Sequence, residues 1–338
     1  MLSISVARRV VQECLHLDGS ERVVIVTDES PGHELVLGLA AAARARAAEV
    51  TVIGTARTPA EPHGYLSWRP VGPVVAGALQ ACDVAVFYTS TLMALAHDIR
   101  EAAKTGTRML FIPADFDLRR PVVLGEDLGA LDALGDAVTG VLRSAVSVRV
   151  TSAEGTDLRM TATGGAVSHD DCRVPDPGDI DFFPGGMWNL VPQLDSVEGV
   201  VRFTAALHPV GRLTQPVEVT FDGGLVTEVT GGWQATTWLR WLRSFGEAEA
   251  MRFAHLSGGL AGQAQVIGHD WEDLIVRGSV LVAGGASLLY GGAVAAPAHF
   301  DGIVPNATLE IDGRRILDAG EYDPQLLHGN DGSRGLAA

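Results

Sequence analysis

The chain has 338 residues, of which 47% are hydrophobic and 20% are charged. This length allows two domains with a full core each, and the composition is that of a folded globular protein rather than a disordered one. The net charge of −16 argues against nucleic acid or an anionic membrane as a partner.

The N-terminal half of the chain alternates between buried strands and helices. Apolar residues recur at helical spacing near the N-terminus, and apolar runs then alternate with alanine-rich stretches. The predicted strands are 22–28, 49–54, 84–88 and 109–113, and the predicted helices are 3–17, 34–48, 73–81 and 92–104. Such alternation forms a parallel sheet with helices on both faces. We therefore predict an N-terminal doubly wound, Rossmann-like α/β domain over residues 1–147, with no nucleotide-binding glycine motif after its first strand.

The pattern changes after residue 147, where short strands replace the strand–helix alternation. The predicted strands are 148–151, 157–161, 197–204, 217–221 and 225–230, with a helix over 235–245 and a loop rich in Asp, Pro and Gly over 170–186. Alternating apolar residues in short runs indicate antiparallel strands. We therefore predict a C-terminal α+β domain over residues 148–338, which carries the candidate metal ligands.

Three features indicate the cellular setting. The N-terminus has no signal-peptide core, and the uncharged run 279–300 contains two Gly-Gly pairs and Pro297, which favour buried core over a membrane span. Cys14, Cys82 and Cys172 form no Cys-x-x-Cys pair, as expected for reduced thiols without a disulfide framework or structural zinc site. The sequence therefore predicts a cytoplasmic protein without a membrane span.

His299 and Asp301 are the first candidate metal ligands. They are two residues apart, so on an extended strand both side chains lie on the same face. Asp301 is also the first charged residue after the uncharged run 279–300, and a carboxylate in such a setting is costly unless something pairs with it. Imidazole and carboxylate together suit a divalent transition metal. The alternative is an ordinary surface turn.

His255 is the third candidate. It ends the apolar strand 252–255 and opens into the glycine-rich loop 256–260, where a side chain can face a cavity. A structural histidine is the alternative at this position. With His299 and Asp301 it would complete a set of two histidines and one carboxylate, which leaves coordination positions open for oxygen and substrate. Three protein ligands would equally suit a catalytic zinc ion.

The other histidines have simpler interpretations. His169 and Asp171 form a second His-x-Asp, but they lie among turn residues and are interpreted as solvated surface. His269 precedes acidic residues and is interpreted as a helix start, where carboxylates favour the positive end of the helix dipole. His97 follows the apolar stretch 92–96 and is either a core histidine or a general base.

Several short motifs, in this order and spacing, carry a family resemblance. They are Phe-Pro-Gly-Gly-Met-Trp over 183–188 with 192–199, His-Leu-Ser-Gly-Gly-Leu over 255–260, the Gly-rich stretch 278–285 through 291–292, His-Phe-Asp over 299–301 and Lys-Thr-Gly-Thr-Arg over 104–108. The chain resembles the superfamily of thermophilic, aminopeptidase T-like metallopeptidases. The other branch of this superfamily is 2,5-dihydroxypyridine 5,6-dioxygenase.

The resemblance also distinguishes the two branches. Aminopeptidases of this kind have two glutamates and a histidine where this chain has Met187, His255 and Leu281. The two-metal site that activates water in those enzymes therefore cannot be built here. The dioxygenase branch has a histidine where His255 stands and keeps the His-x-Asp of His299 and Asp301. The resemblance thus implies Fe(II) as the cofactor, held by these three residues, with O2 as co-substrate.

By the same resemblance the reaction opens a hydroxylated ring and incorporates both oxygen atoms. A base must deprotonate the substrate hydroxyl, and His97 lies near, but not at, the position of the first-domain histidine of the dioxygenase. The dioxygenase has a histidine where this chain has 182–183 as Phe-Phe. Phe182, Met187 and Trp188 would form a more apolar pocket for a larger or carbocyclic hydroxyarene.

The sequence therefore predicts a mononuclear non-haem Fe(II) dioxygenase that acts on a small aromatic substrate. Two alternatives stay open: an aminopeptidase-like metallohydrolase, and a non-catalytic metal-binding relative of either enzyme. Apolar surface in the second domain favours a homo-oligomer.

Overall fold

The computed structural model describes residues 1–28, 32–57 and 69–328, and the chain divides into two compact units. The first unit consists of residues 1–128 and 170–185, and the second of residues 129–169 and 186–338. The chain therefore passes between the units after residues 128, 169 and 185. This division differs from the single boundary at residue 147 that the change of sequence pattern predicts.

The first unit is built on a five-stranded sheet in the order β2-β1-β3-β4-β8. Its elements are α1 (Leu2–Arg9), the π-helical turn η1 (Val10–Cys14), β1 (Arg22–Thr27), α2 (His33–Arg44), β2 (Glu49–Gly54), α3 (Pro73–Ala81), β3 (Val84–Thr89), α4 (His97–Lys104), β4 (Arg108–Pro113), α5 (Pro121–Gly125) and β8 (Ile180–Phe182). All its strand pairs are parallel. From β1 the chain adds β2 on one side of the sheet and then β3 and β4 on the other side. Because crossovers between parallel strands are right-handed, α2 lies on one face of the sheet and α3 and α4 lie on the other. The predicted doubly wound α/β fold is confirmed.

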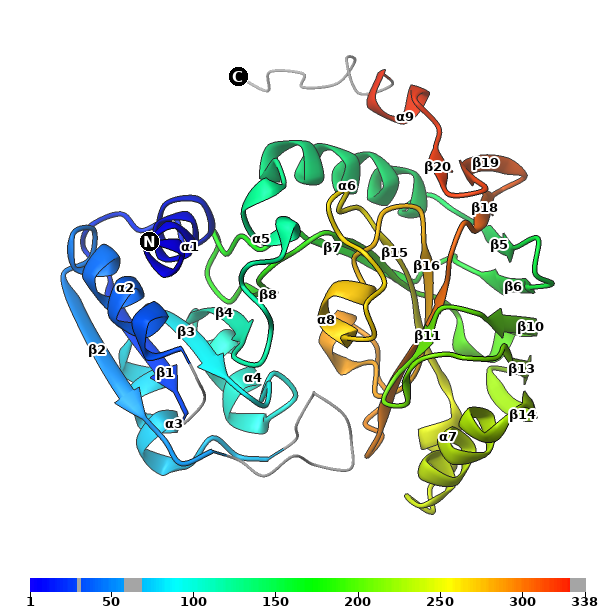
Figure 1. The fold of residues 1–338 in the computed structure, drawn as a ribbon, viewed down its shortest axis with the longest axis horizontal. Helices are drawn as coiled ribbons and strands as arrows, with labels where there is room; N and C mark the ends of the chain where they lie inside the picture. The colour runs from blue at the N-terminus through cyan, green and yellow to red at the C-terminus, as the bar shows by residue number, and fades with distance from the viewer. Residues whose placement is uncertain (29–31, 58–68, 329–338) are drawn as a thin grey trace. The chain divides into compact units, whose positions relative to one another are not determined.

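Two features of the first unit differ from the prediction. The stretch 92–96 is buried but not helical, and α4 begins only at His97, because this apolar run packs into the core as an irregular segment. The stretch 170–186 is not entirely loop. It contributes β8, which pairs with β4 from Met109↔Ile180 to Phe111↔Phe182 and is drawn in green beside the cyan β4 (Figure 1).

The second unit contains two larger sheets. Their orders are β14-β13-β10-β6-β5-β18-β19-β20 and β12-β11-β17-β16-β15-β9-β7. The strands are β5 (Ser147–Thr151), β6 (Asp157–Thr161), β7 (Ala166–Asp170), β9 (Met187–Val191), β10 (Glu198–Phe203), β11 (Ala206–Leu207), β12 (Gly211–Arg212), β13 (Val217–Asp222), β14 (Leu225–Gly231), β15 (Phe253–Gly259), β16 (Val280–Gly285), β17 (His299–Val304), β18 (Thr308–Ile311), β19 (Arg314–Asp318) and β20 (Glu321–Tyr322). The helices are α6 (Leu128–Leu142), α7 (Trp233–Arg243), α8 (Asp270–Asp273) and α9 (Gln325–His328), with 3-10 turns η2 (Leu194–Ser196), η3 (Ala248–Met251) and η4 (Leu288–Tyr290). Together they make an α+β unit, as predicted.

Helix α6 is absent from the sequence prediction. It contains three glycines, which lower helix propensity. The structure gives one of them a packing reason, because a Cβ on Gly135 would lie 2.5 Å from the imidazole of His169. Close packing of this kind groups the helix with the second unit.

Aromatic side chains fill the space between the two sheets of the second unit. Phe203 of β10 lies so close to Gly302 of β17 that a Cβ on the glycine would be 2.2 Å from its ring. Phe221 of β13 packs edge-on against Phe253 of β15, with ring centroids 5.6 Å apart. One face of the seven-stranded sheet is therefore core. Because side chains alternate along a strand, the neighbours of Gly302 in β17 point to the opposite face. In β15 a β-bulge between Phe253 and His255 shifts the alternation, so His255 points to that opposite face as well.

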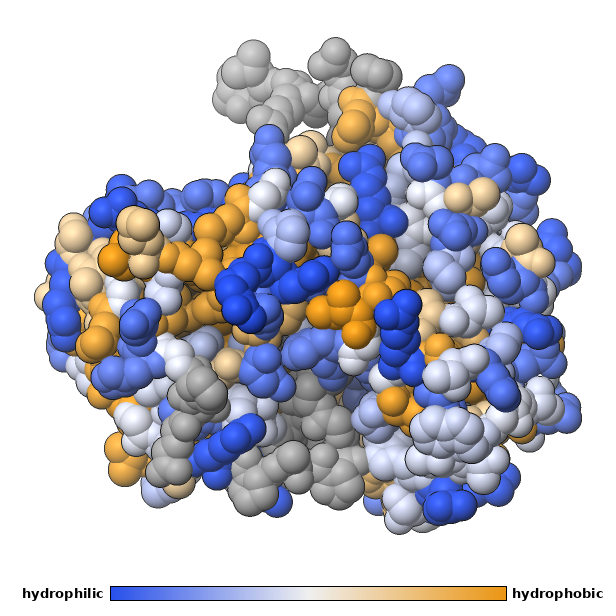
Figure 2. All heavy atoms as spheres, in the orientation of Figure 1, coloured by the Kyte–Doolittle hydropathy of each residue, from blue (hydrophilic) through white to orange (hydrophobic). Residues whose placement is uncertain are grey.

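The surface of the second unit is mostly polar in the view of Figure 2, with small apolar areas between polar side chains. Its exposed large apolar residues come from separate elements and are Val146, Trp233, Ile267 and Leu327. The uncharged run 279–300 forms β16, the turn η4 and the start of β17, and it is buried along the strands but partly exposed between them. Within the described ranges, none of the helices is long and apolar enough to cross a membrane.

Candidate metal centre

Three adjacent strands of the seven-stranded sheet carry the predicted ligands. His255 of β15 is paired with Ala283 of β16, and Ala283 is paired with Asp301 of β17. Directly paired residues lie on the same face of a sheet, and His299 shares this face because it is two residues from Asp301. The small side chain of Ala283 leaves room for the longer side chains to converge. This face is opposite to the aromatic core.

The candidate ligand atoms of His255, His299 and Asp301 all lie within 4.8 Å of one another. His299 Nε2 is 3.3 Å from Asp301 Oδ2. The two imidazole rings are nearly parallel, with centroids 5.3 Å apart. All three side chains are buried. The structure therefore brings together the residues that the sequence analysis selected from three separate stretches.

The hydrogen bonds of His255 define its tautomer. Its Nδ1 is 2.7 Å from Ser257 Oγ, and the Ser257 hydroxyl donates to Asn189 Oδ1 over 2.7 Å. Because the serine proton is used in that bond, Nδ1 of His255 must be the donor to Ser257. The second ring nitrogen, Nε2, then carries a lone pair. This atom is buried and has no hydrogen-bond partner among the residues that the structure describes.

His299 is oriented by a backbone carbonyl. Its Nδ1 donates to the Ala286 oxygen over 2.8 Å, so Nε2 is the atom that faces Asp301. Burial by itself lowers the pKa of this imidazole, but the charge of Asp301, its hydrogen bond and the Ala286 carbonyl together raise the pKa above its usual value. At His255, burial and the adjacent His299 outweigh the attraction of Asp301 and lower the pKa to about 3. His255 is therefore neutral at pH 7.

These residues fit a divalent transition metal. Two imidazole nitrogens and a carboxylate oxygen are the donor set of mononuclear Fe(II) oxygenases, and three protein ligands also suit catalytic zinc. A buried nitrogen lone pair without a partner is costly. A metal ion bound to Nε2 of His255 would remove this cost. The same ion would take the place of the direct ion pair between His299 and Asp301.

Two of the residues predicted to bind substrate, Met187 and Trp188, lie on opposite faces of the seven-stranded sheet. Met187 is paired with Gly259 and therefore lies on the same face as His255. Trp188 is paired with Gly258 and lies on the core face, where its indole N–H donates to the Tyr322 hydroxyl over 2.8 Å. The assignment of Trp188 to the substrate pocket is therefore wrong, because adjacent strand residues point to opposite faces.

Phe182 and His97 belong to the first unit. The Phe182 ring lies 5.7 Å from the ring of Phe111, between centroids, in the parallel sheet. His97 begins α4 with its side chain 73% exposed and lies 3.9 Å from Glu101. His97 is therefore not a core histidine.

The structure also tests the interpretations of two other histidines. His169 is only 14% exposed and lies 3.1 Å from Asp132, so its interpretation as solvated surface is wrong. His269 precedes α8, which confirms the predicted helix start.

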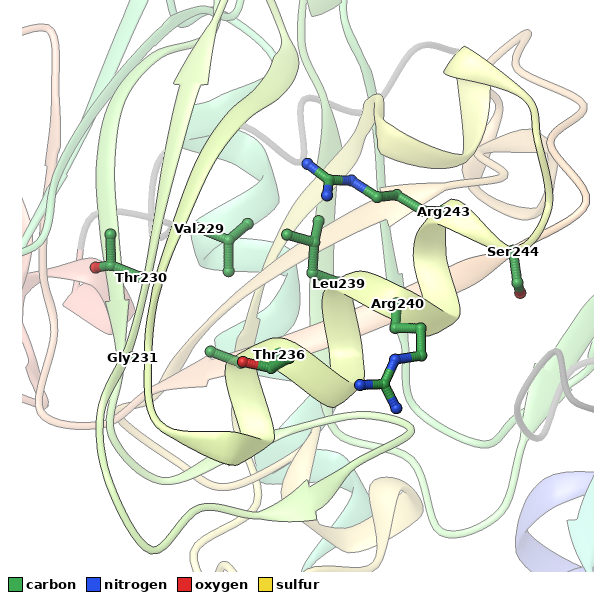
Figure 3. Close-up of a pocket in the computed structure, with 9 residues that line it drawn as sticks. Val229, Thr230, Gly231, Thr236, Leu239, Arg240, Arg243 and Ser244 are labelled. Atoms are coloured by element: carbon green, nitrogen blue, oxygen red, sulfur yellow. The ribbon is translucent and has the colours of Figure 1, made fainter.

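A separate groove of about 670 Å³ lies between β14 and α7 (Figure 3). Its lining residues are Val229, Thr230, Gly231, Ala235, Thr236, Leu239, Arg240, Arg243 and Ser244. None of them is a candidate metal ligand.

Sequence reasoning missed the residues that support the ligands. Ser257 and Asn189 are completely buried polar residues behind His255, and the ring of Tyr290 packs edge-on against His255 with centroids 4.6 Å apart. The alternation along β15 offered one signal, because Ser257 is two residues from His255 and must share its face. Asn189 is 68 positions from Ser257 in the sequence, and only the register between β9 and β15 places the two residues side by side.

Comparisons with known proteins identify a matching family and similar structures. The family model of 2,5-dihydroxypyridine 5,6-dioxygenase (NicX) matches residues 3–323. The 2,5-dihydroxypyridine 5,6-dioxygenase of Pseudomonas putida is 25% identical over 264 residues, which cover 72% of each chain. The solved structure of 2,5-dihydroxypyridine dioxygenase from P. putida KT2440 is similar with a TM-score of 0.82 at 19% identity, over 95% of this chain and 97% of that chain. Wild-type AmpT from Thermus thermophilus is similar with a TM-score of 0.68 at 16% identity, over 95% and 98%.

The fold and the family match together define an oxygenase built on an aminopeptidase-like fold. Because the family model covers nearly the whole chain, the chain belongs to the 2,5-dihydroxypyridine 5,6-dioxygenase family. The predicted resemblance to this branch of the superfamily is confirmed.

Proposed function

We propose that the chain is a mononuclear non-haem Fe(II) dioxygenase that opens a hydroxylated aromatic or heteroaromatic ring with O2. One observation carries the proposal: His255 presents a buried Nε2 lone pair beside His299 and Asp301, and no residue in the described part of the chain bonds to it. Two neutral imidazoles and one carboxylate are the donor set that Fe(II) takes in oxygenases of this kind. Membership of the dioxygenase family supports the same reaction class.

The three ligands would hold Fe(II) on one face of the sheet. A ferrous ion supplies open coordination positions for O2 and for a ring hydroxyl, together with the redox chemistry that dioxygen requires. The protein orients both imidazoles from behind through Ser257 and the Ala286 carbonyl. In the overall reaction the ring is cleaved, and both atoms of one O2 molecule enter the product.

The side chains around the ligands favour one metal ion over two. Leu281 is paired with Ser257 and lies on the ligand face, as does Met187. Neither side chain can ligate a hard divalent metal, and these are the positions where the resemblance places a histidine and a glutamate in the aminopeptidases. The fold shared with AmpT is the one observation that favours a peptidase.

The substrate we propose is a small hydroxyarene that is less polar than dihydroxypyridine. Met187 offers an apolar contact on the ligand face. Phe182 is proposed as an aromatic contact and His97 as the general base that accepts the hydroxyl proton. His97 is suited to proton exchange because it is exposed to solvent. A homo-oligomeric, cytoplasmic enzyme completes the proposal.

Oxygen uptake tests this function. Anaerobically purified protein is supplied with Fe(II) and assayed against hydroxypyridines and di- or trihydroxyarenes, and in parallel against dipeptides with Zn(II), Co(II) or Mn(II). We expect uptake that needs both Fe(II) and an aromatic substrate. Release of amino acids without any oxygen uptake would instead establish the peptidase.

A further inference from the structure

A buried chain of polar side chains lies behind His255 and does not belong to the ligand set. Ser257 is 0% and Asn189 1% exposed, and the two residues are direct partners across β15 and β9. Ser257 Oγ lies 2.7 Å from both His255 Nδ1 and Asn189 Oδ1. Burying three polar groups side by side is costly unless their hydrogen bonds are complete. Each group in this chain must therefore act as donor or acceptor in a fixed order, which is the direction of the chain.

That direction depends on the Asn189 amide. Its Oδ1 accepts from the Ser257 hydroxyl over 2.7 Å, and its Nδ2 donates to Ser168 Oγ over 3.5 Å. The Ser257 oxygen can then only accept from His255 Nδ1–H. With the amide reversed, Ser257 would donate to Nδ1 and the imidazole proton would move to Nε2, the atom that faces the other ligands.

We propose that Ser257 and Asn189 are positioning residues that hold His255 in the tautomer able to bind a metal. The inference rests on the proposed function in that it needs His255 to be a ligand. Asn189 touches neither the ligand atoms nor the imidazole, yet it selects which ring nitrogen carries the proton. Outer groups of this type change metal affinity by about 10- to 100-fold when they are removed.

Different substitutions have different consequences. In Asn189→Leu the Ser257 hydroxyl loses its acceptor and rotates to donate to His255 Nδ1, which stabilises the tautomer that blocks metal binding. In Ser257→Ala the Nδ1–H of His255 loses its acceptor and the ring loses its fixed orientation. Asn189→Asp keeps an acceptor oxygen in the same place, so it preserves the direction of the chain. Ser279→Ala is a matched control, because it removes a buried serine hydroxyl that donates to the Val276 carbonyl, away from the candidate ligands.

Two readouts test the proposal without the ring-cleaving reaction. The first is the 15N chemical shifts of the His255 ring nitrogens in the metal-free protein, which report the tautomer. The second is the dissociation constant for Co(II), with circular dichroism of each variant to verify folding. We expect the Nδ1–H tautomer in the wild-type protein and in Asn189→Asp, with similar Co(II) affinity. We expect the Nε2–H tautomer in Asn189→Leu, with Co(II) affinity weaker by about 10- to 100-fold.

An Nε2–H tautomer in the wild-type protein, or an Asn189→Leu variant with unchanged tautomer and unchanged Co(II) affinity, would overturn the proposal. An equal loss of affinity in the Ser279→Ala control would also overturn it, since any buried hydroxyl would then matter equally. Absence of Co(II) binding by the wild type would refute the metal site and with it the proposed function. A proton on Nδ1 with strong Co(II) binding but no oxygen uptake would support the positioning role and refute only the dioxygenase.

Discussion

Replacing Trp188 with phenylalanine separates a core role of this residue from a role in substrate binding. The indole is fully buried on the core face of β9, and its N–H donates to the Tyr322 hydroxyl over 2.8 Å. Phenylalanine removes the donor and leaves a small cavity. The lost hydrogen bond costs about 1 kcal/mol and the missing ring atoms about 1–2 kcal/mol, so we expect the free energy of unfolding to fall by roughly 2–3 kcal/mol.

Urea unfolding of metal-free protein measures this change. Met187→Ala is the matched comparison, because Met187 directly precedes Trp188 in β9 and points to the opposite face of the sheet. We expect Trp188→Phe to lower stability while the Co(II) dissociation constant and the KM of the aromatic substrate stay unchanged. Met187→Ala should raise KM and leave Co(II) affinity intact. A Trp188→Phe protein with full stability and an altered substrate range would refute the assignment of the two faces.

Two further predictions follow from buried charges. Asp273 is fully buried and accepts hydrogen bonds from His208 Nε2 and from the backbone N–H groups of Ile267 and Gly268, so Asp273→Ala should cost about 3–5 kcal/mol in urea unfolding, and an unchanged midpoint would contradict this. The raised pKa of His299 means that a metal must displace a proton at low pH. Below that pKa the Co(II) affinity should therefore fall about tenfold per pH unit, and above it become constant; calorimetric titrations from pH 5 to about 8 test this, and a flat profile would contradict it.

The proximity of His299 and Asp301 could be predicted because it depends on strand alternation alone, whereas the β-bulge between Phe253 and His255 that turns His255 to the same face could not. His299 and Asp301 are two residues apart, and any extended conformation places them on one face. The structure adds that Ala283 between β15 and β17 allows His255 to reach them. Local sequence also indicated the parallel sheet of the first unit, since three of its four longer strands, β1, β3 and β4, contain continuous apolar runs.

Features that depend on register or on distant packing could not be predicted. Trp188 was misplaced because a shift of one residue along a strand moves a side chain to the other face. Strand β8 has only three residues among Asp, Pro and Gly, so no periodicity is visible, and its return to β4 is a tertiary contact. The support of His255 by Asn189 likewise requires the pairing of β9 with β15.

The metal content of anaerobically purified protein tests the central claim most directly, measured on the wild type and on His255→Ala. The three-ligand site predicts about one iron ion per wild-type chain, and loss of that iron in His255→Ala without loss of the folded state. Two zinc or manganese ions per chain, or full iron retention by His255→Ala, would contradict the assignment of His255, His299 and Asp301 as the ligands.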